Sequence, residues 1–154
     1  MVIRKAISSD VDKIYSLLEG VLRLHANGRP DIFNQSGSKY NHSQILEIIA
    51  CENTPVFVAD DGGVIGYVFC EILDQQSGAL KSIKTLYIDD LCVDEKAQKK
   101  GVGRALYEKA LAFAKEKGCY NLTLNVWAFN ENAIKFYEKL GLTTLKTTLE
   151  QIVD

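Results

Sequence analysis

The 154-residue sequence lacks the features that mark membrane, secreted and nucleic-acid-binding proteins. No apolar run approaches the roughly 18 residues that cross a bilayer. Residues 1–5 lead into neither a long apolar stretch nor a small-residue cleavage site, so we expect no secretory signal. The formal net charge of −2 lacks the basic excess typical of nucleic-acid binding. We therefore expect a cytoplasmic protein with small-molecule partners, and neither a nucleic acid nor a membrane among them.

Prolines, linkers and paired cysteines are also scarce. The chain has two prolines and no internal repeat, low-complexity segment or Pro/Gly-rich linker, which favours one domain over residues 1–154. The four cysteines stand far apart without a C-x-x-C pair, so we expect reduced, buried thiols and no metal site. They are Cys51, Cys70, Cys92 and Cys119.

The apolar pattern alternates between helix and strand periods. Ile14, Leu17, Leu18 and Val21 form the stripe of an amphipathic helix, whereas residues 121–126 alternate apolar and polar side chains as a strand does. This pattern predicts a mixed α/β (α+β) fold in the order β-α-α-β-β-β-α-β-α-β. The expected strands are 1–6, 56–60, 64–73, 85–93, 121–127 and a β-prone tail at 142–153, and the expected helices cover about 10–27, 43–49, 101–118 and 130–141. An irregular segment at 28–41 and a polar loop at 75–82 connect them.

A glycine-containing loop stands between the fourth expected strand and the following helix. It reads Gln98-Lys99-Lys100-Gly101-Val102-Gly103-Arg104. Unpaired N–H groups at a helix N-terminus, with glycines that let the backbone approach closely, suit a pyrophosphate. The loop matches neither the P-loop motif G-x-x-x-x-G-K-S/T nor the dinucleotide-binding fingerprint, which needs a third glycine where this chain has Leu106. Taken alone, the loop also fits an ordinary solvated basic cluster.

Two motifs together resemble a known family. The run Leu91-Cys92-Val93, followed by the loop 98–103, resembles the acetyl-CoA motif Q/R-x-x-G-x-G/A of the GNAT superfamily of N-acetyltransferases. Residues 130–142 resemble that family's N-x-x-A-x-x-x-Y-x-x-x-G-F/L helix, one strand further on, with Leu142 in place of the commoner phenylalanine. The two motifs cover roughly residues 84–142.

The resemblance implies a mostly antiparallel, splayed mixed sheet flanked by helices, with acetyl-CoA as cofactor. The central strand and the strand at 121–127 part to admit the pantetheine arm, and the glycine loop binds the pyrophosphate. The residues that it implies for coenzyme A binding are Leu91, Cys92, Val93, Gln98, Lys99, Lys100, Gly101, Val102, Gly103, Arg104, Asn125, Asn130, Asn132, Ala133, Phe136 and Tyr137.

Tyr137 has two interpretations. It shares an apolar helical stripe with Ala133 and Leu140, which by itself is typical of a core tyrosine. In the family that the chain resembles, a tyrosine at this position faces the cofactor sulfur and acts as general acid. A phenol with a pKa near 10 can protonate a leaving thiolate whose thiol has a pKa near 8.5. The resemblance therefore implies that Tyr137 is catalytic.

The attacking amine must be neutral, and deprotonating an alkylamine at pH 7 costs about 4 to 5 kcal/mol. One carboxylate, or a water held by it, can meet this demand. Asp89 and Asp90 on the central strand are the leading candidates, although alternation puts them on opposite faces unless a bulge intervenes. The pair resembles the acidic pair of the polyamine-acetylating branch, in which Asp89 matches the cleft carboxylate. We interpret Asp89 as catalytic and as a substrate contact, with Asp90 as an outer contact.

Further substrate contacts are expected at His25, Phe33 and Glu71, although His25 also fits a partly buried structural histidine. An acetyl-cysteine intermediate at Cys92 is disfavoured, because no adjacent residue lowers its pKa, so we expect direct attack in a ternary complex. A polyamine or other cationic amine is the favoured substrate. Amino sugars, amino acids, protein N-termini and lysines remain alternatives, as does a non-catalytic acyl-CoA-binding or sensing domain. The β-prone tail can pair across a homodimer.

Overall fold

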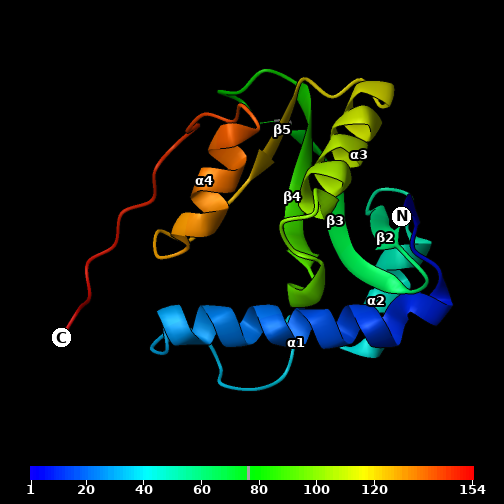
Figure 1. Ribbon diagram of the computed structural model, residues 1–154. Helices are drawn as coiled ribbons and strands as arrows, with labels where there is room; N and C mark the ends of the chain where they lie inside the picture. Colours follow the sequence, from blue (N-terminus) through cyan, green and yellow to red (C-terminus); the bar gives the residue numbers. More distant parts are fainter. Residues whose placement is uncertain (76) are drawn as a thin grey trace.

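A five-stranded sheet forms the centre of the molecule in the computed structural model, which describes residues 1–75 and 77–154 (Figure 1). Neighbouring strands follow the chain order, from β1 at one edge to β5 at the other. The pairs from β1 to β4 are antiparallel, whereas β5 is parallel to β4. The strands are β1 (Val2–Lys5), β2 (Val56–Asp60), β3 (Val64–Gln75), β4 (Ile83–Val93) and β5 (Asn121–Leu124).

Helices cover both faces of the sheet. They are α1 (Val11–Gly28), α2 (His42–Ala50), α3 (Val102–Glu116) and α4 (Glu131–Lys139), with 3₁₀ turns at Ser8–Asp10 and Glu95–Ala97. In Figure 1, α3 lies across the sheet, α1 runs along one end of it, and α4 stands beside β5. No helix in the described parts of the chain has both the length and the apolarity that a membrane crossing needs.

Alternating side chains on β2 divide the apolar core into two layers. Phe57 and Ala59 point toward α3, whereas Val56 and Val58 point toward α1 and α2. All four are almost fully buried. Because successive strand residues face opposite sides, the continuous apolar run of this strand is the expected pattern for a sheet with helices on both faces.

The predicted class is confirmed: the fold is a mixed, mostly antiparallel sheet flanked by helices. The largest difference is at the tail, where residues 142–154 form neither strand nor helix. Within the described residues, the tail beyond Leu142 makes no backbone hydrogen bond to a strand. The strand predicted at 121–127 ends earlier, at Leu124. Cys51 is exposed instead of buried. The predicted polar loop at 75–82 includes Gln76, which lies outside the described residues.

Candidate active site

A β-bulge in β4 brings two carboxylates onto one face of the sheet. Phe69 and Cys70, which are consecutive on β3, pair with Asp90 and Ile88, so Asp89 is the extra residue. The β4 residues that pack against α3 are even-numbered before the bulge and odd-numbered after it. Asp89 and Asp90 therefore both face the side of α1 and α2. The strict alternation that would separate them does not apply here.

β4 and β5 separate at the level of this bulge. Their parallel pairing ends with Ile88 and Leu124, although β4 continues to Val93. The backbone groups of residues 89–93 consequently have no partner on β5. Figure 1 shows the two strands diverging toward α1. The separation lies where the sequence motifs predict the cofactor arm, beside the predicted residues Leu91 and Cys92.

The loop between β4 and α3 presents backbone N–H groups at a helix N-terminus. Gly101 precedes the first residue of α3, Val102, and has a φ of +81°, with open space where a Cβ would lie. Lys99 also has a positive φ, of 63°, which is uncommon for a residue with a side chain. Left-handed residues alternating with ordinary ones form a concave nest of N–H groups that attracts anions. The local backbone thus fits a pyrophosphate.

The polar side chains of this loop are mostly engaged or solvated. Gln98 donates from Nε2 to the carbonyl oxygen of Val93 at 3.2 Å, so it ties the loop to the end of β4. Arg104 donates from Nε to Glu108 at 2.8 Å, one helical turn away. Lys99 and Lys100 are exposed. Backbone groups are therefore better placed than these side chains to define the anion site.

Helix α4 is fixed against the start of α3 by close packing. A Cβ on Gly103 would lie 3.2 Å from Cζ of Phe136, so the ring reaches almost to the backbone of α3. At the other end of α4, Oδ1 of Asn130 accepts the N–H of Ala133 at 3.2 Å and caps the helix. These contacts give two of the predicted cofactor residues structural roles. Asn132 is exposed beside them.

Tyr137 is mostly buried on α4, and its hydroxyl makes no hydrogen bond to another described residue. Burial raises the pKa of Tyr137 well above its usual value, and the negative charge of Asp90 raises it further. Tyr137 therefore keeps its proton at physiological pH, as a general acid must.

Asp90 is an unusual carboxyl group for a strand. Oδ2 accepts a hydrogen bond of 2.7 Å from the hydroxyl of Tyr67, which is fully buried. Burial raises the pKa of Asp90 to about 6, a rise that the Tyr67 hydrogen bond and the charge of Lys39 partly oppose. A group that titrates close to neutral pH can both accept and release a proton there.

Asp89 has a different environment, because a loop residue already neutralises it. Nζ of Lys39, in the segment between α1 and α2, lies 2.9 Å from Oδ1 and 3.3 Å from the carbonyl oxygen of Asp89. The hydroxyl of Tyr40 donates to Oδ2 at 2.6 Å. The Tyr40 ring stacks on Phe69, with centroids 5.7 Å apart. Burial, and then this hydrogen bond to Asp89, raise the pKa of Tyr40, to which the charges of Asp90 and Glu71 also contribute.

An aromatic cluster joins the end of α1 to the segment between β5 and α4. The rings of His25 and Phe33 lie 5.1 Å apart, and Phe33 meets Trp127 edge to face at 4.9 Å. Phe129 stacks on Trp127 at 6.2 Å and lies so close to Gly28 that a Cβ there would be 2.4 Å from its ring. Burial, and then the nearby charge of Lys39, lower the pKa of His25 and so favour its neutral form.

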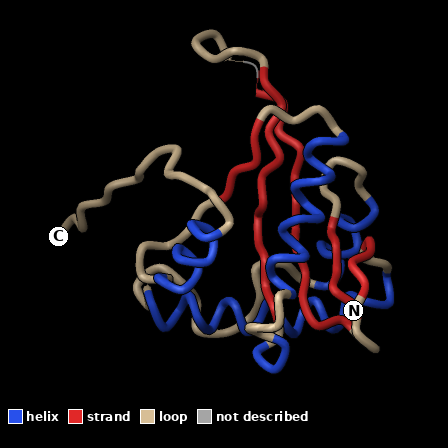
Figure 2. Tube along the Cα trace, turned by 45° about the horizontal axis from the view of Figure 1, so that its top comes forward, coloured by secondary structure: helices blue, strands red, loops and turns tan. Residues whose placement is uncertain are grey.

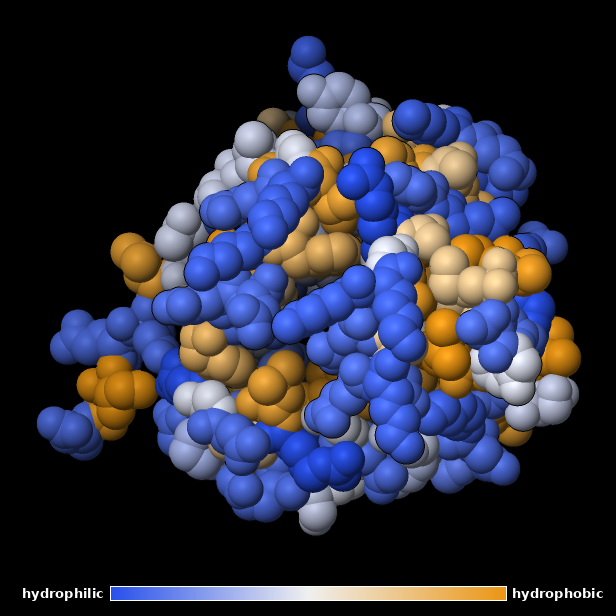
Figure 3. Space-filling model, in the orientation of Figure 1, coloured by the Kyte–Doolittle hydropathy of each residue, from blue (hydrophilic) through white to orange (hydrophobic). Residues whose placement is uncertain are grey.

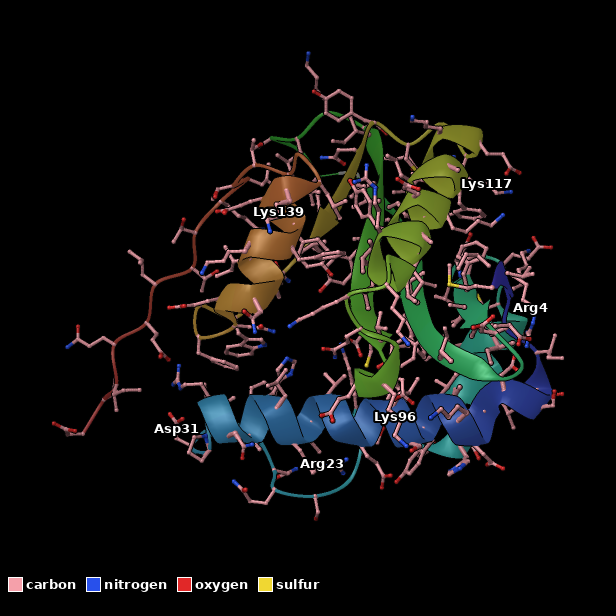
Figure 4. The ribbon with its side chains drawn as sticks, viewed as in Figure 1. Arg4, Arg23, Asp31, Lys96, Lys117 and Lys139 are labelled. Atoms are coloured by element: carbon pink, nitrogen blue, oxygen red, sulfur yellow. The ribbon has the colours of Figure 1, made fainter. Side chains whose placement is uncertain are left out.

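A hollow of about 260 Å³ opens behind this cluster. It is lined by Leu24, Phe129, Asn130, Glu131 and Asn132. Neither Asp89 nor Asp90 borders it, so we do not assign the acceptor amine to it. Figure 4 shows side chains in the space between α4 and β4, on the side where β4 and β5 part.

Cys92 is the predicted cofactor residue with the most reactive side chain, but its surroundings suppress that reactivity. Burial raises the pKa of Cys92 to about 12, and the charges of Asp90 and Asp94 add to the rise. A thiol with such a pKa is protonated at neutral pH and is a poor nucleophile. This supports the expectation of direct attack by the amine.

The structure brings some of the predicted site residues together. Phe136 packs against Gly103 at the start of α3, and Asp89 and Asp90 share one face of β4 at the bulge. Asn125 donates from Nδ2 to the hydroxyl of Tyr87 at 3.2 Å. Sequence reasoning missed Lys39, Tyr40, Tyr67, Trp127 and Phe129. Trp127 could have been found as the chain's one tryptophan just beyond a motif strand, whereas Lys39 and Tyr40 lie in an irregular segment without a pattern.

Comparison with known proteins agrees with this geometry. An uncharacterised N-acetyltransferase of the pepI 3′ region of Lactobacillus delbrueckii subsp. lactis is 34% identical over 87 residues, 56% of this chain and 50% of that protein. N-alpha-acetyltransferase 30 of Xenopus laevis is 35% identical over 77 residues, 50% of this chain and 27% of that protein. The chain thus spans half or less of these two curated relatives.

Solved structures match over nearly the whole chain. A mutant of the BH1408 protein from Bacillus halodurans is 29% identical with a TM-score of 0.95, covering 99% of each chain. The aminoglycoside acetyltransferase meta-AAC0020 from a soil metagenomic sample, 21% identical, shares the fold with a TM-score of 0.72 over 99% of this chain and 95% of that one. Residues 18–142 match the acetyltransferase (GNAT) family. This chain therefore belongs to the acetyltransferase (GNAT) family.

Proposed function

We propose that this protein transfers the acetyl group of acetyl-CoA to a primary amine by direct attack in a ternary complex. The observation that carries the proposal is the convergence of three features at one level of the sheet. β4 and β5 part there, the bulge sets Asp89 and Asp90 on one face there, and burial raises the pKa of Asp90 to about 6. Family membership supports the reaction class.

The residues present fit acetyl-CoA. Backbone groups of residues 91 and 92, which have no partner on β5, would hold the pantetheine arm as an added strand would, with Val93 at the end of this segment. The nest around Gly101 would hold the pyrophosphate. When bound, acetyl-CoA supplies a thioester carbonyl and a thiolate leaving group. The side chains of Lys99, Lys100 and Arg104 would add positive charge around the phosphates.

Proton transfer would be divided between two groups with separated pKa values. Asp90, with a pKa of about 6, is ionised at pH 7.5 and is basic enough to take a proton from the amine, directly or through water. Tyr137 would keep its proton on Oη for delivery to the departing sulfur. This assignment moves the base from Asp89, predicted from sequence, to its neighbour, because Lys39 and Tyr40 already engage Asp89.

We further propose that Asp89 reads a second positive charge on the substrate. Lys39 shows what this carboxylate binds: an ammonium group at 2.9 Å, on a side chain that is 48% exposed and able to move aside. A diamine could replace Lys39 at Asp89 while its other nitrogen approaches Asp90. Glu71 extends the negative charge, and the paired rings of His25 and Phe33 would supply an aromatic wall.

A coenzyme A release assay across amine classes tests the proposed function. Diamines and polyamines should be the best acceptors, ahead of amino sugars, free amino acids and peptides with a free N-terminus or lysine. Acetylation confined to a peptide would remove the polyamine assignment. Saturable binding of acetyl-CoA without turnover of any amine class would instead favour an acyl-CoA sensor.

The substitution Asp89→Asn tests the charge-reading role separately. It should raise KM for a diamine well above its effect on a monoamine of equal length, because only the diamine has a second ammonium group to lose. Asn53→Ala, at an exposed position before β2, is a control that leaves both KM values unchanged. Equal losses for both amines would show that Asp89 does not read the second charge.

A further inference from the structure

Three aromatic rings lie beside the two carboxylates of the bulge. β3 and β4 run side by side over most of their length (Figure 2), and their register places Phe69 opposite Asp90. Tyr67 lies opposite Cys92, so it is a diagonal neighbour of Asp90 on the same face. The Tyr67 ring meets Phe69 edge to face, with centroids 5.0 Å apart, and the Tyr40 ring stacks on Phe69 at 5.7 Å. Phe69 therefore contacts both tyrosines and fixes the position of one ring relative to the other.

Each tyrosine binds one oxygen of one carboxylate. The hydroxyl of Tyr67 donates to Oδ2 of Asp90 at 2.7 Å, and that of Tyr40 donates to Oδ2 of Asp89 at 2.6 Å. Such short O–H···O distances are typical of a hydroxyl bound to an ionised carboxylate. Burial raises the pKa of both phenols, so both hydroxyls keep their protons and remain donors at neutral pH.

The second oxygen of each carboxylate is left for another group. Oδ1 of Asp89 binds the ammonium group of Lys39 at 2.9 Å. No side chain within residues 1–75 or 77–154 forms a hydrogen bond to Oδ1 of Asp90. A hydroxyl that fixes one oxygen also orients the other, because the carboxylate is rigid and planar. At Asp89 the oxygen oriented in this way binds an amine, and the same arrangement at Asp90 suits it to a second one.

The two tyrosines differ in burial. Hydrophilic side chains cover much of the face of the molecule in Figure 3, and a hydroxyl among them can bond to water. Tyr67 is fully buried, so its hydroxyl depends on Asp90 for a partner. Tyr40 is half-buried and belongs to the irregular segment between α1 and α2. The contact to Asp90 is therefore part of the core, whereas the contact to Asp89 lies in a loop.

Other charges act on the same carboxylate. Burial raises the pKa of Asp90, the hydrogen bond from Tyr67 and the charge of Lys39 lower it, and the charge of Asp89 raises it. Within the described residues, Tyr67 is the only side chain that forms a hydrogen bond to Asp90. Other ionisable side chains on the elements that pack on this face include Glu71 on β3, Cys92 on β4, Lys13 on α1, His42 on α2, Tyr40 in the irregular segment and Tyr137 on α4. Lys13 and His42 are paired with Asp94 and Asp12 instead.

We propose that Tyr67 and Tyr40 are positioning residues with separate tasks, Tyr67 for the proton-accepting carboxylate of Asp90 and Tyr40 for the charge-reading carboxylate of Asp89. Tyr67 fixes Oδ2 of Asp90 and stabilises its ionised form, which leaves Oδ1 to take a proton from the amine. Tyr40 fixes Oδ2 of Asp89 in the same way, so that Oδ1 meets the second ammonium group. Phe69 keeps the two hydroxyls at a constant spacing. This division of tasks rests on the proposed function.

Tyr67→Phe tests the first task. Loss of the hydroxyl removes a bond that stabilises the ionised carboxylate, so the acidic limb of turnover should move to higher pH by about one unit. The ratio of the KM values for a diamine and a monoamine of equal length should not change. Phenylalanine keeps the ring contact with Phe69, so the circular dichroism spectrum should be unchanged. An acidic limb that stays in place would overturn the task assigned to Tyr67.

Tyr40→Phe should give the opposite pattern. It loosens Asp89, so KM for the diamine should rise a few-fold, while KM for the monoamine and the acidic limb stay unchanged. Tyr15→Phe is the matched control, because Tyr15 is a half-buried tyrosine of the same apolar layer and stacks on His42 at 4.3 Å. It should change neither quantity. If Tyr67→Phe and Tyr40→Phe move the same quantity, the tasks are not divided and the proposal fails.

An NMR titration of the carboxyl carbons measures the effect of Tyr67 without catalysis. The pKa of Asp90 should be about one unit higher in Tyr67→Phe and unchanged in Tyr40→Phe and Tyr15→Phe. Asp90→Asn identifies the signal of Asp90 by its loss. An unchanged pKa in Tyr67→Phe would overturn the proposal even if the protein acetylates diamines. A raised pKa in a protein that acetylates no amine would support the control of Asp90 by Tyr67 and contradict the proposed function.

Discussion

The two sides of the gap between β4 and β5 are built from different parts of the polypeptide. On the proposed cofactor side, the features that suit an anion are backbone N–H groups, a glycine with positive φ and the first turn of α3. On the proposed acceptor side, the polar groups belong to side chains. They are the two carboxylates at the bulge, the hydroxyls of Tyr40 and Tyr67, and the ammonium group of Lys39. A backbone site recognises a group common to many reactions, whereas a side-chain site can change its substrate by substitution.

The largest expected effect is at the point where the two sides meet. Tyr137→Phe should lower turnover by roughly 10²-fold to 10⁴-fold, the usual contribution of a positioned acid, with acetyl-CoA affinity within a few-fold. The lost hydroxyl has no hydrogen-bond partner in the described chain, so the variant should fold normally. Tyr120→Phe, at a tyrosine that is 77% exposed, is the control. Full turnover under conditions where chemistry limits the rate would make Tyr137 a core residue.

Gly101→Val sharpens the comparison on the cofactor side. A β-branched residue resists a φ of +81°, so the N–H groups should move and acetyl-CoA affinity should fall by about tenfold or more, equivalent to about 1.4 kcal/mol. Lys99→Ala should cost less, because it removes one exposed charge. Gly62→Val places the same strain, at a φ of +77°, in the β2–β3 turn and should leave binding intact. Calorimetry in which Lys99→Ala has the larger effect would indicate a simple charge patch.

Asp90 should set the acidic limb of the pH profile. With a pKa of about 6, the basic form is lost below that pH, so turnover should fall tenfold per pH unit on the acid side. Asp90→Asn should abolish that limb together with most activity. Asn can still accept the Tyr67 hydrogen bond, which keeps the strand intact. If the fall in turnover near pH 6 persists in Asp90→Asn, another group must be responsible for the acidic limb.

The same shift makes a prediction about stability. The folded pKa of Asp90, about 6, lies above the value of 3.8 for a free side chain. The fold therefore favours the neutral acid, and this contribution is complete below about pH 4 and lost as the pH rises through 6. Asp90→Asn should consequently be more stable than the unmodified protein at pH 8, by up to about 3 kcal/mol at 1.36 kcal/mol per unit, with little gain at pH 4. Urea unfolding at the two pH values measures the difference.

The smallest expected effects belong to Lys39. Lys39→Met removes the cation that competes for Asp89 and should lower KM for a diamine a few-fold, with little change for a matched monoamine. A rise in diamine KM in Lys39→Met would show that Lys39 shapes the site instead of competing with the substrate.

Higher ionic strength should raise the KM of the unmodified protein for a diamine more than it lowers kcat, because salt screens the encounter between charged groups before it affects desolvated groups.

Sequence patterns predicted most of the fold because the helices and strands are strongly periodic. The backbone of the glycine loop was also predictable, because Gly101 has the left-handed φ that glycine tolerates best. Its role in cofactor binding stays a prediction. The acceptor side was less predictable from the sequence. Lys39 and Tyr40 reach Asp89 across 50 and 49 residues of sequence, and no periodicity encodes such a contact. The tail was predicted as a strand from its residue types, but a strand also needs a partner.

The bulge in β4 has an evolutionary consequence. Every β4 residue after the bulge faces the side opposite to the one that strict alternation along the strand would give. Loss of Asp89 would restore a regular ladder in which Asp90 still faces α1 and α2 and Leu91 still faces α3. The apolar layer under α3 would therefore keep its residues while one carboxylate disappears. The bulge thus adds a side chain to the acceptor side without a change in the core.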